Sequence, residues 1–156
     1  MKAIEAENIK SVTGALFLSN VFDEFLVTEA SFSALYDITI EGQINREFLQ
    51  EGEEPAEDCV SWGQIREYCF NFIKGKKTPL KFKIVFRMPN SRLKGFISKY
   101  GLNFAPEDIN ALFLNVIFDG GGLKFVTGTS MKTFTMDRSL DEAWDVQMTK
   151  FISNID

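Results

Sequence analysis

The chain has 156 residues, of which 17 are Lys or Arg and 22 are Asp or Glu, so its formal net charge is −5. This length and composition are typical of one folded domain and exclude a disordered chain. The chain contains no His, which excludes Ser-His-Asp and Cys-His catalysis and removes the commonest metal ligand. With only two cysteines, a four-Cys zinc site cannot form within one chain. We therefore predict no metal, no cofactor and no catalytic residue, and an enzyme is the less favoured class.

The compartment is predicted from the N-terminus and the cysteines. The first ten residues, MKAIEAENIK, contain no apolar stretch of the kind that a signal peptide needs. The longest apolar runs are far shorter than the roughly 20 residues of a membrane-spanning helix. Cys59 and Cys69 do not form a C-x-x-C motif and are interpreted as two free thiols. These features predict a cytoplasmic protein that does not enter a membrane.

The first third of the chain contains candidate helices and strands. Apolar residues at helical spacing predict a helix over Ile4–Leu18, with Asn8 as a candidate N-cap. Phe22–Glu29 and Ser31–Gln43 are interpreted as strands, the second from its alternation of apolar and polar residues. Asn45–Gln50 could form a short helix.

The middle third contains an acidic loop, a helix and a strand. Glu51–Asp58 holds five acidic residues, a Gly and a Pro, and is interpreted as an exposed loop. A helix is predicted over Ser61–Lys74, with Ser61 as its cap and Gly75 as its stop. The period-two alternation of Leu80–Met88 predicts a strand with Phe82, Ile84 and Phe86 buried on one face and Lys81, Lys83 and Arg87 exposed on the other.

The last third predicts a hairpin between two helices. Arg92–Tyr100 is a short helix, and Asn110–Asp119 and Leu123–Gly128 are strands joined by a glycine-rich turn. Lys132–Met136 could add a further strand. A final helix begins at the candidate cap Ser139 and should lie on the hairpin.

The fold class follows from how these elements are connected. Short turns join most of the strands, and long helical crossovers are few, which favours antiparallel pairing. We predict a single α+β domain over residues 1–156, with a mainly antiparallel β-sheet and helices packed on one face.

The most informative signal for function is a basic segment. Residues 68–106 contain no Asp or Glu and hold nine of the 17 cations, which leaves eight cations against all 22 acids in the rest of the chain. Such a segment could accept an anion, and we take six of its nine cations as candidate binding residues. The hydroxyls of the Thr127–Ser130 stretch could also help to cradle an anion. The candidate binding residues are Lys74, Lys76, Lys77, Lys81, Lys83, Arg87, Thr127, Thr129 and Ser130.

Several interpretations of this segment stay open. The cations could simply neutralise acids elsewhere in the fold or keep an edge strand soluble. The leading functional interpretation is a non-enzymatic binding domain whose partner is an acidic protein surface or a phosphate-bearing ligand. The alternatives are an enzyme that acts on a phosphate-bearing or acidic small molecule and a nucleic-acid-associated protein. The net charge of −5 argues against nucleic acid, because domains that bind it are usually basic.

Short patterns along the chain resemble an uncharacterised bacterial family of small single-domain proteins, a domain of unknown function. The patterns lie at Val21–Leu26, Cys69–Phe70, Ile73–Phe86, Leu112–Asn115, Thr127–Ser130, Lys132–Thr135 and Ala143–Asp145. The likeness spans nearly the whole chain, the basic segment included. It implies a single-domain, cytoplasmic protein and brings no activity, cofactor or catalytic residue.

Overall fold

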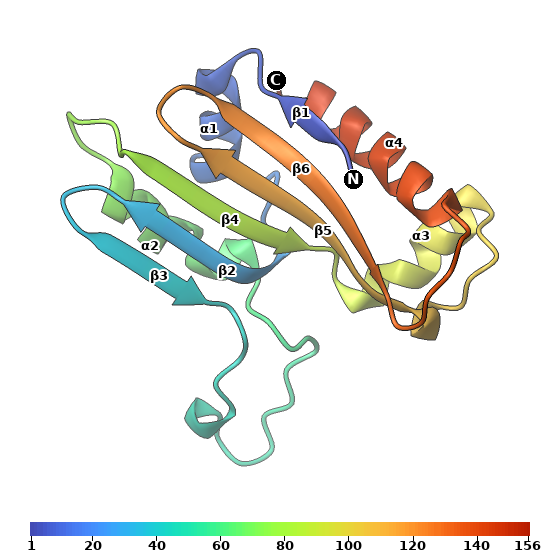
Figure 1. Cartoon of the computed structure of the whole chain (residues 1–156). Helices are drawn as coiled ribbons and strands as arrows, with labels where there is room; N and C mark the ends of the chain where they lie inside the picture. Colours follow the sequence, from blue (N-terminus) through green and yellow to red (C-terminus); the bar gives the residue numbers. More distant parts are fainter.

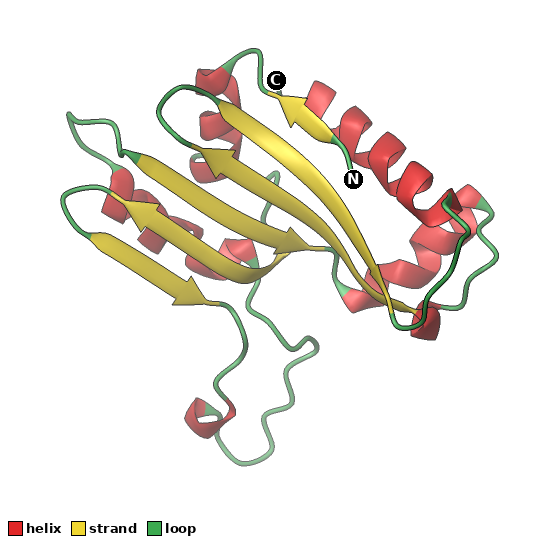
Figure 2. Ribbon diagram, in the orientation of Figure 1, coloured by secondary structure: helices red, strands yellow, loops and turns green.

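A six-stranded antiparallel sheet forms one layer of the protein in this computed structural model, which describes all 156 residues (Figure 1). The strands are β1 (Ala3–Glu5), β2 (Leu26–Ser33), β3 (Asp37–Glu41), β4 (Lys81–Arg87), β5 (Ile109–Phe118) and β6 (Leu123–Met131). They pair in the order β1-β6-β5-β4-β2-β3. The helices are α1 (Ile9–Phe17), α2 (Trp62–Ile73), α3 (Leu93–Tyr100) and α4 (Ser139–Ser153). All four helices cover the same face of the sheet, which confirms the α+β prediction (Figure 2).

Alternation of apolar and cationic residues gives β4 its two faces. Phe82, Ile84 and Phe86 are buried against the helices, whereas Lys81 and Lys83 are exposed on the helix-free face. The strand pairs with β2 on one side and β5 on the other, so it lies in the middle of the sheet. The predicted strand and its buried face are confirmed, whereas Arg87 on the opposite face is only partly exposed.

The hairpin of β5 and β6 is also confirmed. Its turn contains Gly120 at φ +85°, a conformation that glycine adopts at little cost. The carboxylate of Asp119 accepts hydrogen bonds from the backbone N–H groups of Gly121 and Gly122, at 3.0 and 3.2 Å. Short polar residues and glycine therefore close the turn as the sequence predicts.

A core cluster of 28 buried residues fills the space between the sheet and the helices. Phenylalanine supplies much of its bulk: the rings of Phe22 and Phe86 stack with centroids 5.3 Å apart. The indole N–H of Trp62 donates to the carbonyl of Leu16 at 2.7 Å and so links α2 to α1. The indole N–H of Trp144 donates to the carbonyl of Phe113 at 2.8 Å, which holds α4 on the hairpin.

The predicted caps are confirmed at two helices and wrong at one. The side chain of Asn8 accepts a hydrogen bond from the N–H of Ser11 at 3.0 Å, so Asn8 is the cap of α1, as predicted. At α2, Ser61 is the N-cap residue, as predicted, but its hydroxyl accepts no backbone hydrogen bond; its own N–H donates to the side chain of Gln64 at 2.9 Å. The prediction for Ser139 is wrong, because Ser139 is already helical and its N–H donates to Asp137.

Three predicted boundaries need correction. Ile4 is not helical, because β1 pairs with β6 through a partner more than 100 residues away, which local periodicity cannot reveal. The predicted boundary between the first two long strands, at Ala30, is also wrong. The residues before Leu26 form turns, and β2 continues to Ser33 before the chain reverses into β3. The predicted strand over Lys132–Met136 does not form, since β6 ends at Met131, level with the start of β5 at Ile109.

An arm projects from the sheet between β3 and α2, at the lower edge of Figure 1. We call residues 44–58 the acidic arm, because they include Glu47, Glu51, Glu53, Glu54, Glu57 and Asp58. The N–H of Ile44 donates to the carbonyl of Asp58 at 2.9 Å, so the two ends of the arm meet at its base. The exposed acidic loop is thus confirmed.

None of the helices has the length and apolar character that crossing a membrane requires.

Candidate functional site

The structure divides the six cations among the candidate binding residues into three groups. Lys74, Lys76 and Lys77 lie on the loop between α2 and β4, which we call the lysine loop (residues 74–79). Lys81 and Lys83 lie on the helix-free face of the sheet. Arg87 lies at the far end of β4, beside the acidic arm. The nine candidate residues therefore do not converge on one site.

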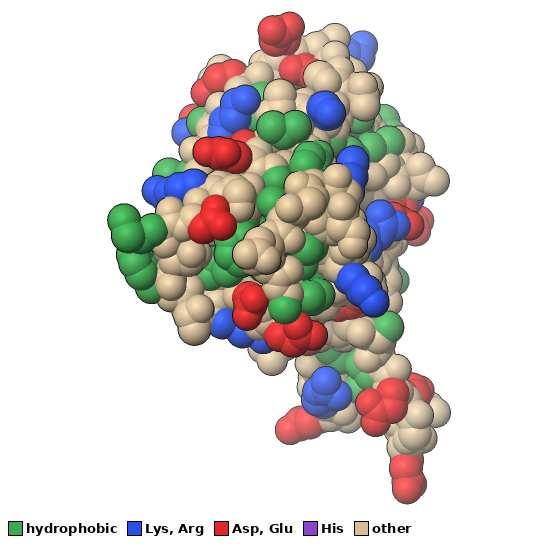
Figure 3. Space-filling view, turned by 90° about the vertical axis from the view of Figure 1, so that its right-hand side faces the viewer, with side chains coloured by type: hydrophobic (Ala, Val, Ile, Leu, Met, Phe, Trp, Pro, Cys, Tyr) green, Lys and Arg blue, Asp and Glu red, His purple; other side chains and the backbone are tan.

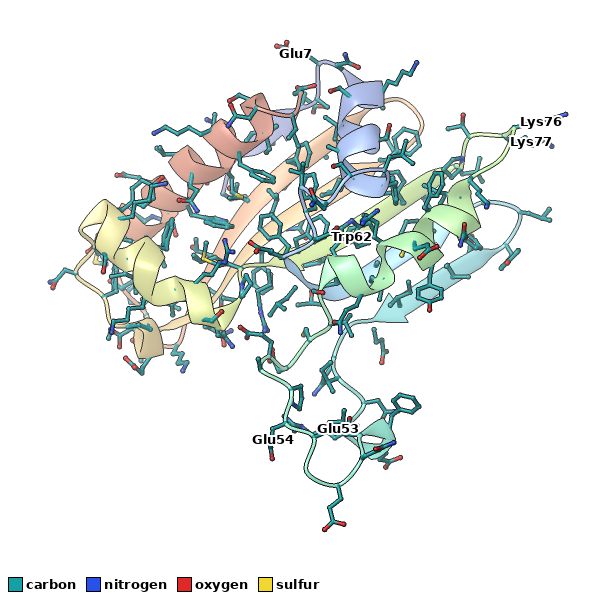
Figure 4. All side chains as sticks on the ribbon, turned by 180° about the vertical axis from the view of Figure 1, so that it is seen from behind. Glu7, Glu53, Glu54, Trp62, Lys76 and Lys77 are labelled. Atoms are coloured by element: carbon teal, nitrogen blue, oxygen red, sulfur yellow. The ribbon has the colours of Figure 1, made fainter.

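The lysine loop starts where α2 ends. The last turn of the helix closes with the N–H of Lys74 donating to the carbonyl of Phe70 at 2.8 Å. Gly75 follows at φ +145°, which an L-residue rarely adopts, and Pro79 leads the chain towards β4. The loop is exposed, and Lys76 and Lys77 extend away from the body of the protein (Figure 4). Its geometry presents cations to solvent and leaves their amino groups free to move.

A groove of about 660 Å³ lies on one side of the lysine loop, between α1 and α2. Its floor is aromatic: Phe82 lies edge-on to Phe17 at 5.6 Å and stacks on Phe118 at 5.1 Å between ring centroids. Apolar side chains of both helices form its walls. Three lysines reach its edge, and no Asp or Glu lines it; these lysines are Lys10, Lys74 and Lys77.

A second hollow, of about 510 Å³, lies on the other side of the loop. It is bounded by the β2–β3 turn, where Leu35 is almost fully exposed, and by Phe72 and Leu80. Lys74, Lys76 and Lys77 line it, again without an acidic residue. The loop thus stands between two hollows that both combine apolar walls with cations alone.

Other hollows beside the basic segment contain acids. Lys81 and Lys83 share theirs with Asp37 and Asp119. Arg92 and Lys99 line a hollow between α3 and α4, where Arg92 forms a salt bridge with Glu24. In Figure 3, cationic and acidic side chains are interspersed over this end of the molecule, and acidic ones gather on the projecting arm. Positive charge without neighbouring acids is therefore a property of the lysine loop.

Arg87 is engaged within the fold. Its guanidinium forms a salt bridge with Asp58, and its side chain is only 11% exposed. The hydrogen bond from Arg87 holds the pKa of Asp58 below its usual value, against the opposing effect of partial burial. This pair ties the base of the acidic arm to β4, so Arg87 serves the fold at this position.

The hydroxyls of the Thr127–Ser130 stretch also have partners within the protein. Thr127 donates to Asp145 and Thr129 donates to Asp141, both on α4. Ser130 accepts a hydrogen bond from the side chain of Asn110 at 3.1 Å. These residues belong to β6 and are separated from the lysine loop, so the structure does not bring the two parts of the predicted site together.

The two cysteines are free and buried. Burial raises the pKa of the Cys69 thiol to about 12, and burial likewise raises the pKa of Cys59. Both thiols therefore stay protonated near neutral pH, the form that is a poor nucleophile. No group of three or more Cys, Asp or Glu side chains is placed to hold a metal ion.

Sequence reasoning missed Lys10 and the groove itself. Lys10 lies on α1, more than 60 residues before the lysine loop, and only the packing of α1 beside α2 brings it to that loop. Gly14 gave a partial signal. A glycine within a predicted helix lowers helix stability, and in the structure its missing side chain leaves the groove open.

Comparisons with known proteins identify a family. No curated protein and no solved structure matches the chain. The model of the family described as "Family of unknown function (DUF5721)" matches residues 15–156, which include the lysine loop, the whole sheet except β1, and α4. The chain therefore belongs to the DUF5721 family, a family of unknown function.

Proposed function

We propose that this protein is a non-enzymatic binding domain that holds a ligand bearing phosphate or carboxylate groups at the lysine loop. The observation that carries the proposal is that both hollows flanking the loop are lined by lysines and by no acid. None of the three lysines of the loop forms a salt bridge, and neither hollow supplies a carboxylate to them. Three amino groups left without such partners are available to an external anion.

The salt bridges of the protein support the same interpretation. Four salt bridges form, and all four use arginine: Arg66, Arg87, Arg92 and Arg138. No lysine of the basic segment is paired with a carboxylate. A role for these lysines in neutralising the protein's own acids is therefore disfavoured for the lysine loop, where the acidic arm lies far from Lys76 and Lys77 (Figure 4).

The test is titration with inorganic polyphosphate over a series of salt concentrations. We expect binding at low salt that weakens as salt rises, because exposed charges are screened over roughly 8 Å at physiological ionic strength. The triple variant Lys74→Gln/Lys76→Gln/Lys77→Gln should lose at least about tenfold in affinity. Lys81→Gln/Lys83→Gln/Lys94→Gln removes the same charge from other places and should retain most of the binding. Equal losses in both variants, or no binding by the native protein, would refute the proposal.

We also infer that the protein works in the cytoplasm, on the support of its two unpaired thiols. Titration of thiols in the unfolded protein, purified without reductant, should find both of them free. A disulfide between Cys59 and Cys69 in protein isolated from its native cell would contradict this inference.

A further inference from the structure

We infer that the groove between α1 and α2 binds an amphipathic anion, with the apolar chain of the ligand on the aromatic floor and its acidic head at the lysines. This inference rests on the proposed function and names the class of ligand for the same site. It commits to a small molecule that carries one medium-length acyl or alkyl chain and a carboxylate or phosphate head.

The floor of the groove is built for an apolar chain. Phe17, Phe82 and Phe118 belong to the main core cluster, yet each keeps a few per cent of its surface exposed and lines the groove. The walls add aliphatic side chains from both helices, among them Leu18, which is 68% exposed. At about 660 Å³, the groove lies within the range of roughly 300–1,000 Å³ that small-molecule sites occupy.

The charge at the edge selects the head group. Lys10 approaches from α1, and Lys74 and Lys77 approach from the end of α2 and the loop, so cations stand on both sides of the apolar floor. A neutral apolar ligand would gain from the floor but not from these lysines. An inorganic anion would gain from the lysines but not from the floor. Only a ligand with both parts uses the whole lining.

Gly14 keeps the groove open. A Cβ added at this position meets no atom within 4 Å, so the fold itself does not require glycine there. Alanine or leucine would also stabilise the helix, because glycine is a poorer helix former than either. Gly14 therefore lowers helix stability at a place where a larger side chain would fit. The space that it leaves in the groove is available to a ligand.

The chain offers a matched control for filling this space. Gly95 also lies within a helix, and a Cβ there also meets no atom within 4 Å, but Gly95 is exposed and lines none of the hollows described. Gly14→Leu should therefore fill the groove, whereas Gly95→Leu makes the same change at a surface without a groove. Both variants should fold, because leucine is a better helix former than glycine.

The experiment is isothermal titration with dodecanoate, dodecyl phosphate, dodecanol and octanoate, the three anions below their critical micelle concentrations and dodecanol below its solubility limit. We expect dodecanoate or dodecyl phosphate to bind at least tenfold more tightly than dodecanol. Whichever of the two anions binds more tightly identifies carboxylate or phosphate as the preferred head group. Octanoate should bind more weakly, by about fourfold for each methylene that the floor no longer contacts, the equivalent of about 0.8 kcal/mol.

The variants separate this inference from the proposed function. Gly14→Leu should lose at least tenfold in affinity for dodecanoate and keep its affinity for polyphosphate, while Gly95→Leu should match the native protein with both. Lys10→Gln/Lys74→Gln/Lys77→Gln should bind dodecanoate no better than dodecanol.

Polyphosphate binding without dodecyl binding would overturn this inference alone, and the absence of both would overturn the proposed function as well. Binding to phosphatidylglycerol vesicles without binding to monomeric dodecanoate or dodecyl phosphate would assign the groove to a membrane surface and also overturn the inference.

Discussion

At the scale of single residues, arginine and lysine have different roles in this protein. Arg66 makes a two-point contact with Asp23, at 2.8 and 3.1 Å, and the other three salt bridges also use guanidinium groups. The planar guanidinium matches a carboxylate at two points, whereas an ammonium is a mobile point charge on a flexible stem. Arginine thus fastens loops and helices together, whereas the unpaired lysines are available to the anionic ligand that we propose.

The first prediction concerns the pair of Asp58 and Arg87. Because the pKa of Asp58 is lowered in the folded protein, its carboxylate contributes stability above the ordinary aspartate value of about 3.9, and that contribution is lost as pH falls through the folded pKa. Asp58→Asn should lower the free energy of unfolding at pH 7 by up to about 1 kcal/mol, a modest value because Asp58 is 54% exposed. Below about pH 4 the difference from the native protein should shrink.

Urea denaturation between pH 2.5 and pH 7 measures this effect. Asp37→Asn is the control, since the side chain of Asp37 is exposed and takes part in no salt bridge. That variant should follow the native curve at every pH. A loss from Asp58→Asn that stays constant down to pH 2.5 would show that charge on Asp58 is not what stabilises the arm.

The second prediction concerns Trp144, which is fully buried between α4 and the sheet. Its ring lies edge-on to Phe96 with centroids 5.7 Å apart, and its N–H pairs with a backbone carbonyl. Trp144→Ala should cost about 3–5 kcal/mol of unfolding free energy, the usual range for a large core aromatic. Trp144→Phe keeps most of the bulk and should cost less. A loss below about 1 kcal/mol for Trp144→Ala in chemical denaturation would remove Trp144 from the core.

At the scale of elements, the base of the acidic arm is a crowded junction. The N–H of Gly42 donates to the carbonyl of Thr28 at 2.9 Å, and its own carbonyl accepts from Val60 at 2.8 Å. A Cβ at Gly42 would stand 1.6 Å from the carbonyl oxygen of Val27, which is backbone and cannot move aside alone. The end of β3, the start of β2 and the end of the arm therefore meet where only glycine fits.

The third prediction compares Gly42→Ala with Gly95→Ala. The first should destabilise the protein by roughly 1–3 kcal/mol or more, because strands must separate to admit the methyl group. The second should stabilise it by up to about 1 kcal/mol, because its helix has open space there. Thermal unfolding of both variants decides the point. Equal effects would mean that the close approach at Gly42 is relieved at no cost.

Local patterns predict the elements whose contacts are mostly their own. The alternation of β4, the turn of the β5–β6 hairpin and the Asn8 cap are each readable from neighbouring residues, and all are confirmed. By contrast, β1 forms only through its pairing with β6, in which Ile4 lies opposite Phe125. The groove has the same origin, since Lys10 and Lys74 share it through helix packing. Charge composition thus indicated a wider basic segment that includes the lysine loop, while the choice of the loop and the apolar half of the proposed site required the tertiary structure.

At the scale of the whole molecule, charge is separated along the protein. The acidic arm and the lysine loop extend from different parts of the molecule, and Figure 4 shows Glu53 and Glu54 far from Lys76 and Lys77. The negative charge of the arm repels anions that the lysine loop attracts. The distance between the arm and the loop decides how strongly salt screens this repulsion. Beyond roughly 8 Å at physiological ionic strength, the repulsion is largely screened, so the arm should affect anion binding only when salt is low.

The last prediction follows from this separation. Replacing residues 46–56 by Gly-Gly removes one Arg and four Glu, which changes the formal net charge from −5 to −2. The fold should persist, because Ile44 and Asp58 are already paired at the base of the arm and a shorter loop between them costs little entropy. Polyphosphate should then bind more tightly than to the native protein at 10 mM salt, where the screening length is roughly 30 Å. At 150 mM salt the two proteins should bind polyphosphate equally, because the repulsion from the arm is then screened. A gain in affinity that persists at 150 mM salt would contradict the prediction, since it would place the arm in contact with the ligand.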